Sequence, residues 1–87
     1  MQKTYKVKVL GKVQGVGFRF ESYQQFVDLN LVGKAENTPD GGVEIVVTGE
    51  EENLNRFLEW AKQGPVGARV SGVEHKETEA PAEEKKS

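Results

Sequence analysis

The chain has 87 residues, of which 36% are hydrophobic and 30% are charged, and its formal net charge is -2. This length allows one domain with one hydrophobic core. With no cysteine and one histidine, the composition excludes a disulfide framework, a thiol nucleophile and a multi-histidine metal cluster. No apolar run approaches the roughly 20 residues of a membrane-spanning helix. We therefore expect a cytoplasmic protein that uses no metal ion.

Charge is distributed unevenly along the chain. The first twenty residues contain no acidic residue and five basic ones: Lys3, Lys6, Lys8, Lys12 and Arg19. Such a bias favours binding of an anion, and it fits a solvated charged face equally well. The stretch after Glu77 is rich in Glu, Lys and Ala, so it cannot bury enough apolar surface to offset the entropy of ordering. We predict a folded domain at residues 1–77 and a disordered tail at 78–87.

The spacing of apolar residues predicts the first two elements. Tyr5, Val7 and Val9 alternate with lysines, which predicts a half-buried strand over residues 3–10. After a loop with three glycines, apolar residues recur at steps of three and four, which predicts an amphipathic helix over residues 19–30. The expected apolar face of this helix consists of Phe20, Tyr23, Phe26 and Val27.

A hairpin comes next. A strand over residues 31–37 leads into the turn Thr38-Pro39-Asp40-Gly41, where proline sets the first central dihedral and glycine accepts a left-handed conformation. The return strand covers residues 42–48.

A second helix and a last strand complete the order. Acidic residues at 50–52 begin the helix, and Gly64-Pro65 ends it. Its apolar stripe consists of Leu54, Phe57, Leu58 and Ala61. The last strand begins near Val66, and a break in its alternation predicts a bulge at Ser71-Gly72. The order βαββαβ predicts an α+β, ferredoxin-like fold, with both helices on one face of a four-stranded antiparallel sheet.

The loop between the first strand and the first helix is the candidate for chemistry. Gly15 and Gly17 can turn successive N–H groups inward at a helix N-terminus, where the helix dipole favours negative charge, and Arg19 can grip the same anion. From spacing alone, these glycines could equally serve only to shape a tight connection.

Two motifs make the chain similar to a known family. The first is Gly11-x-Val13-Gln14-Gly15-Val16-Gly17-Phe18-Arg19, and the second is Gly33-x-Ala35-x-Asn37-x-x-Asp40-Gly41-x-Val43-Glu44-x-x-x-x-Gly49. In this order they resemble the two signatures of the acylphosphatase family, and the similarity extends over residues 5–76. The resemblance implies the ferredoxin-like fold and hydrolysis of acyl phosphates, which are mixed anhydrides of a carboxylic acid and phosphate, without a metal or cofactor.

The resemblance also implies which residues act. The phosphate would be bound at Gln14, Gly15, Val16, Gly17, Phe18 and Arg19, through backbone N–H groups and the guanidinium. Arg19 and Asn37 would be the catalytic residues, and the Asn37 amide would orient the attacking water. The expected partner is a small-molecule acyl phosphate acted on by a monomer, with no nucleic acid and no membrane.

Other interpretations of these residues remain open at this point. Arg19 could pair with Glu21 or another carboxylate, and Asn37 could bond to the backbone before the Pro39 turn. The whole chain could be a noncatalytic phosphate-, RNA- or protein-binding module, or a relative of the acylphosphatase-like domain of larger carbamoyl-transfer proteins.

The chain also departs from the family. Lys34 stands at a usually aromatic position, Glu36 follows on the same expected face, and the C-terminus is acidic where relatives generally end in a short apolar strand. We expect the strand at 31–37 to be an open edge, with Lys34 and Glu36 as charges that discourage edge-to-edge aggregation.

Overall fold

The computed structural model describes residues 1–79. Its elements are β1 (Gln2–Lys12), α1 (Phe18–Asp28), β2 (Val32–Asn37), β3 (Val43–Glu50), α2 (Glu51–Gln63) and β4 (Arg69–Glu77). The predicted order is therefore confirmed, with boundaries that shift by a few residues. Most of the tail predicted at 78–87, namely residues 80–87, lies outside the described residues.

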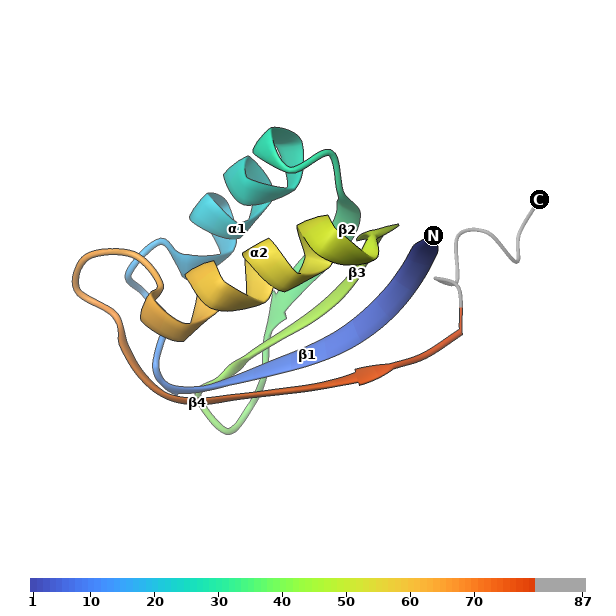
Figure 1. Cartoon of the computed structure of the whole chain (residues 1–87). Coiled ribbons are helices and arrows are strands. Elements are labelled where there is room, and N and C mark those ends of the chain that lie inside the picture. Colours follow the sequence, from blue (N-terminus) through green and yellow to red (C-terminus); the bar gives the residue numbers. More distant parts are fainter. Residues whose placement is uncertain (80–87) are drawn as a thin grey trace.

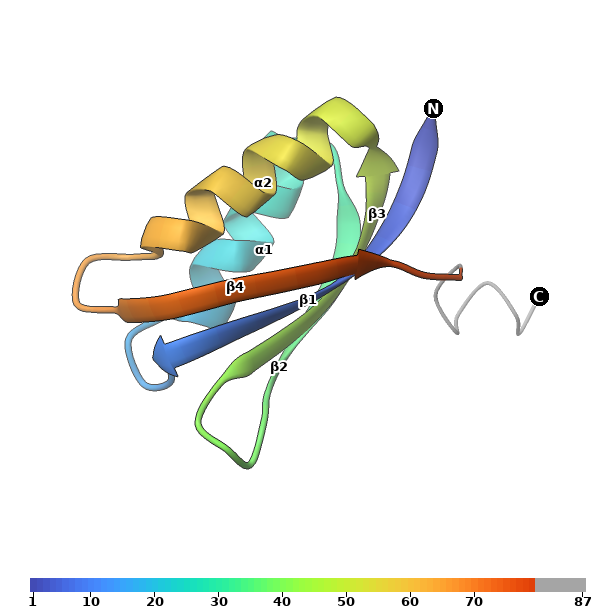
Figure 2. The ribbon, with the colours of Figure 1, turned by 60° about the horizontal axis from the view of Figure 1, so that its bottom comes forward.

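The strands form one antiparallel sheet in the order β2-β3-β1-β4. Both helices lie on the same side of this sheet (Figures 1 and 2). The predicted α+β, ferredoxin-like fold is thus confirmed. β1 and β3 are the central strands of this sheet, so each has a strand on both sides.

The core lies between the sheet and the helices. Alternate residues of β1 and β3 face it, as the strand pattern predicts, and the buried members are Tyr5, Val7, Val9, Val43, Ile45 and Val47. The predicted stripe of α2 is confirmed, since Leu54, Phe57, Leu58 and Ala61 are all buried. The opposite face of the sheet carries Lys6 and Lys8 of β1.

The predicted apolar face of α1 is wrong in three of its four positions. Phe20, Tyr23 and Val27 are exposed, by 67%, 41% and 80%, and only Phe26 is buried. The helix instead buries Phe18, Ser22 and Phe26, which are spaced four residues apart. Ser22 tolerates burial because its hydroxyl donates to the Phe18 carbonyl at 2.8 Å, so a polar residue occupies the inward face.

The bulge predicted in the last strand is confirmed. Leu10 of β1 pairs with Gly72, and the next residue, Gly11, pairs with Val70. Ser71 is therefore the extra residue of β4. Gly11 has a φ of 122°, and a Cβ atom there would come within 2.1 Å of the Arg69 carbonyl oxygen, so this close approach of β1 and β4 requires glycine.

β2 is an edge strand of the sheet that residues 1–79 form. Lys34 and Glu36 are exposed and form an ion pair of 3.2 Å. Charged side chains on an edge strand discourage pairing with another chain. The structure therefore fits the expected role of these two departures from the family pattern.

We predict that the amide hydrogens of residues 32–36 exchange faster than those of β3, because β2 is paired on one side only. Hydrogen exchange followed by NMR on the intact chain would measure this. The buried half of β1 serves as the internal reference for strong protection. Protection along residues 32–36 equal to that of β1 would contradict an open edge.

Candidate functional site

One pocket, of about 180 Å3, lies where the end of β1 and the start of α1 meet the end of β2. Its lining residues are Val13, Gly15, Gly17, Phe18, Arg19, Phe20 and Asn37. It therefore brings together Gly15, Gly17, Phe18, Arg19 and Asn37, which the two motifs supply from positions far apart in the sequence. Gln14 and Val16, the other two predicted site residues, do not line it.

The loop that enters α1 has the two left-handed glycines that the predicted anion site requires. Gly15 and Gly17 have φ angles of 78° and 81°, the left-handed region that favours glycine. The first backbone hydrogen bond of α1 joins the Glu21 N–H to the Gly17 carbonyl at 2.9 Å, so the N–H groups of residues 18–20 precede the helical ladder. Such N–H groups at a helix N-terminus bind phosphate.

Arg19 is the guanidinium of this pocket. It is exposed, and no carboxylate of residues 1–79 lies within 4.0 Å of it. The alternative pairing with Glu21 therefore does not occur. Three lysines of β1 behave differently, since each has an acidic partner: Lys3 with Glu51 and Glu77, Lys6 with Glu44, and Lys8 with Asp40. The N-terminal positive bias is thus largely neutralised, except at the loop.

Asn37 ends β2 and lines the pocket together with the first residues of α1. Its alternative role, bonding to the backbone of the turn, is filled by Asp40, whose carboxylate accepts from the Thr38 hydroxyl and the Gly42 N–H. Within residues 1–79 the Asn37 side chain makes no hydrogen bond. Its amide is therefore available to a molecule in the pocket.

Asp40 holds the hairpin next to Asn37. Its hydrogen bonds from Thr38 and Lys8, then that from Gly42, lower the pKa of this carboxyl below its usual range. The Lys8 ammonium lies 3.0 Å from the carboxylate and joins β1 to the turn. The predicted turn at 38–41 is confirmed by the hydrogen bond from the Gly41 N–H to the Thr38 carbonyl, at 3.1 Å.

Gln14 contacts the hairpin with its side chain. Its amide nitrogen donates to the carbonyls of Thr38 and Gly42, both at 2.8 Å. The side chain thus ties the anion loop to the turn that follows Asn37. Val16 is half-buried and packs against the core. Since both side chains have other contacts, Gln14 and Val16 could contact phosphate only through their backbone N–H groups.

Two pocket residues, Val13 and Phe20, were not predicted as site residues. Val13 is buried, and Phe20 is largely exposed at the edge of the pocket. Phe18 points into the core, where its ring lies 5.1 Å from that of Trp60. The position of Phe20 directly after Arg19 could have indicated a place at the pocket. The apolar periodicity of the helix instead assigned Phe20 to the buried face.

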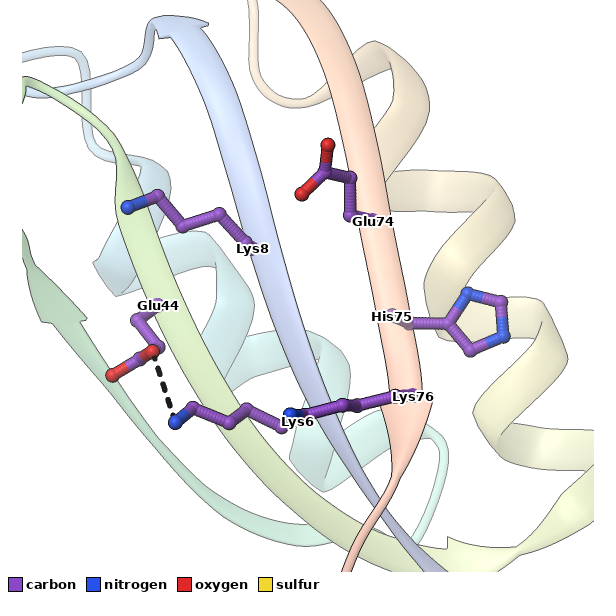
Figure 3. Close-up of a pocket in the computed structure, with 6 residues that line it drawn as sticks. All are labelled: Lys6, Lys8, Glu44, Glu74, His75 and Lys76. Atoms are coloured by element: carbon purple, nitrogen blue, oxygen red, sulfur yellow. Dashed lines mark ion pairs between the residues drawn. The ribbon is translucent and has the colours of Figure 1, made fainter.

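A larger hollow, of about 340 Å3, lies on the open face of the sheet and contains none of the predicted site residues. Figure 3 shows side chains of β1, β3 and β4 around it, with Lys6 paired to Glu44 at 3.5 Å. His75 points away from the other five side chains in this view, and its ring lies 5.1 Å from that of Tyr5. Two of its three lysines have carboxylate partners, Lys6 in Glu44 and Lys8 in Asp40.

Two general features complete the description of residues 1–79. They contain no group of three or more His, Asp or Glu residues placed to hold a metal ion. In the same stretch, neither helix has the length and apolar character needed to cross a membrane.

We predict that Gly17→Ala weakens phosphate binding. A Cβ atom at Gly17 would meet nothing within 4 Å, but the left-handed backbone disfavours alanine by about 1 to 2 kcal/mol, and relaxation would rotate the N–H groups out of the pocket. An NMR titration of the variant with inorganic phosphate would measure the affinity.

Gly67→Ala is the matched control, because Gly67 has a φ of 96° and no place in the pocket, and a Cβ atom there would meet only the Val16 side chain, at 4.0 Å. Both variants should lose similar stability, and only Gly17→Ala should lose phosphate affinity. Equal affinities in the two variants would contradict the role of the loop conformation.

Comparison with known proteins identifies relatives along almost the whole chain. The acylphosphatase family model matches residues 5–87. The acylphosphatase of Aliivibrio fischeri is 46% identical over 78 residues, which cover 90% of this chain and 87% of the relative.

Solved structures agree with the sequence match. An acylphosphatase from Coxiella burnetii superposes with a TM-score of 0.88 at 36% identity, covering 92% of this chain and 84% of that chain. Full-length HypF in its phosphate- and nucleotide-bound form matches with a TM-score of 0.85 at 28% identity, but the match covers only 11% of that chain. Relatives that match along most of their own length carry the name of one enzyme family, and the two motifs of that family meet at one pocket. The chain belongs to the acylphosphatase family.

Proposed function

We propose that the chain hydrolyses acyl phosphates to a carboxylate and inorganic phosphate by attack of water, without a metal ion. The observation that carries this proposal is the joining of an anion-binding loop, an unpaired arginine and an unpaired asparagine amide in one pocket. Membership of the acylphosphatase family supports the reaction class.

The loop and Arg19 bind the phosphoryl group in this proposal. The N–H groups ahead of the α1 ladder and the guanidinium donate to its oxygens. Phosphoryl transfer passes through a loose transition state, so catalysis depends mainly on positioning and on stabilising the charge on these oxygens. The loop residues Gly15, Gly17 and Phe18 line the pocket, so the loop can supply both with little reorganisation.

Asn37 positions the water. Asn37 lines the pocket from the end of β2, and Arg19 lines it from the start of α1. The leaving group is a carboxylate whose acid has a pKa of about 4 to 5, so it departs without a general acid. Arg19 is the one ionisable residue among the seven that line the pocket, and the proton of the water can pass to the substrate phosphate.

The alternative of a noncatalytic RNA- or protein-binding module is not favoured. Sheet surfaces that recognise RNA present aromatic side chains on their central strands. Here the hollow on the open face is lined by Lys6, Lys8, Glu44, Glu74, His75 and Lys76. The exposed aromatic residues Phe20 and Tyr23 lie on α1 instead.

Phosphate release from acetyl phosphate and benzoyl phosphate, with and without EDTA, tests the proposal. Release above the uncatalysed rate that is unchanged by EDTA is the expected result. A phosphate monoester with a poor leaving group, such as phenyl phosphate, is the control and should be turned over far more slowly. Absence of release would overturn the reaction, and loss of activity in EDTA would overturn the metal-free step.

The catalytic unit in this proposal is the domain of residues 1–77, acting in the cytoplasm as a monomer on a small molecule. Light scattering of the active sample would check the monomer.

A further inference from the structure

Tyr23 joins the two elements that carry Arg19 and Asn37. It lies on α1 one turn after Arg19, and its hydroxyl oxygen accepts the N–H of Ala35 at 2.9 Å. The same hydroxyl faces the Ala35 carbonyl at 3.5 Å. Ala35 lies on β2, two residues before Asn37. One side chain thus connects the start of α1 to the end of β2.

The tyrosine is held for this contact by its ring. The ring packs edge-on against that of Phe26, with centroids 5.3 Å apart, and Phe26 in turn contacts Phe57 of α2. The Tyr23 side chain is still 41% exposed, so core packing alone does not explain its position. Its hydroxyl bonds to the backbone of the edge strand β2 on one side. β3 pairs with β2 on the other side.

We propose that Tyr23 is a positioning residue that sets the placement of Asn37 relative to Arg19. This inference rests on the proposed hydrolysis. Tyr23 does not line the pocket, so it acts on the reaction through β2. The N–H groups of the loop and Arg19 belong to the entry of one helix, whereas Asn37 belongs to a separate strand, and the Tyr23–Ala35 bond spans the two.

This division predicts a selective effect of Tyr23→Phe. The variant keeps the ring and its contact with Phe26 but loses the bond to Ala35. Because small displacements of positioning groups lower reaction rates steeply, kcat for acetyl phosphate should fall by about tenfold. Affinity for inorganic phosphate should stay unchanged, because the loop and Arg19 keep their own backbone. The Ala35 amide hydrogen should exchange faster, which would report the lost bond directly.

A double-mutant cycle with Asn37→Ala is the decisive experiment. If Tyr23 acts through Asn37, Tyr23→Phe should lower kcat in the otherwise unchanged protein and have no further effect in Asn37→Ala. Tyr5→Phe is the matched control: Tyr5 is buried on β1, beside His75 and away from the pocket, and its variant should leave kcat unchanged in both backgrounds. Melting temperatures of all variants would show any general loss of stability.

The outcomes separate the two proposals. An unchanged kcat in Tyr23→Phe, or the same proportional loss in both backgrounds, would overturn the positioning role while leaving the hydrolysis intact. A parallel loss of phosphate affinity would overturn it as well, because the effect would then reach the loop. Absence of acyl phosphate hydrolysis in the unchanged protein would instead overturn the proposed function.

Discussion

Arg19→Gln should lose phosphate binding and acyl phosphate hydrolysis together. A hydrogen bond to a charged group contributes about 1.5 to 3 kcal/mol, so the affinity for inorganic phosphate should fall by about 10- to 100-fold. The transition state gains more from the guanidinium than the bound phosphate does, and an arginine that stabilises a transferring phosphoryl group contributes about 10^3-fold or more in rate. We therefore expect kcat/KM to fall further than the affinity for phosphate.

The stability of this variant should be close to that of the unchanged protein, because Arg19 is exposed and has no ion-pair partner among residues 1–79. Arg56→Gln is the control, since Arg56 lies on α2 and pairs with Glu52. Steady-state kinetics with acetyl phosphate, a phosphate titration and thermal melting would compare the two. Normal phosphate affinity in Arg19→Gln would contradict the assignment of Arg19 to the anion site.

Asn37→Ala should separate turnover from phosphate binding. The amide is proposed to orient water rather than to hold the phosphoryl group, so kcat should fall by about 10^2- to 10^3-fold, the usual loss for a single preorganised polar group. Inorganic phosphate should bind with almost unchanged affinity. A loss confined to kcat is the kinetic signature of an interaction that is made in the transition state.

Asn55→Ala provides the control for the removal of an exposed asparagine, because Asn55 lies on α2 outside the loop pocket. It should retain normal kcat. Single-turnover measurements would establish that the chemical step, and not product release, is affected in Asn37→Ala. Near-normal turnover in that variant would remove the water-positioning role.

The buried face of a helix was predictable from the sequence where all of its inward residues are apolar. It was not predictable where a polar residue is buried through a hydrogen bond. The stripe of α2 contains only apolar residues, so its period identifies the buried face. In α1 the inward face includes Ser22, which hydropathy assigns to solvent and which is buried through its bond to Phe18. The side chains of Phe20 and Val27 completed a regular pattern on the wrong face of the helix.

The same distinction applies to the candidate site. The motifs supplied Gly15, Gly17, Arg19 and Asn37, which the fold places around one pocket. They did not reveal that the Gln14 side chain donates to two carbonyls of the β2–β3 turn. The two acceptor residues, Thr38 and Gly42, lie 24 and 28 positions after Gln14 in the chain. Long-range hydrogen bonds of this kind depend on the assembled fold, and local spacing carries no signal for them.

The pocket has two halves, which the contacts of Gln14 and Tyr23 join. The anion loop is continuous with the central strand β1, whereas Asn37 belongs to the edge strand β2, which is joined to the loop by Gln14 and to α1 by Tyr23. Edge strands open at lower free energy than central ones. We therefore expect fraying of β2 to withdraw Asn37 while the loop stays in place, which would give a conformation that binds phosphate without hydrolysing an acyl phosphate.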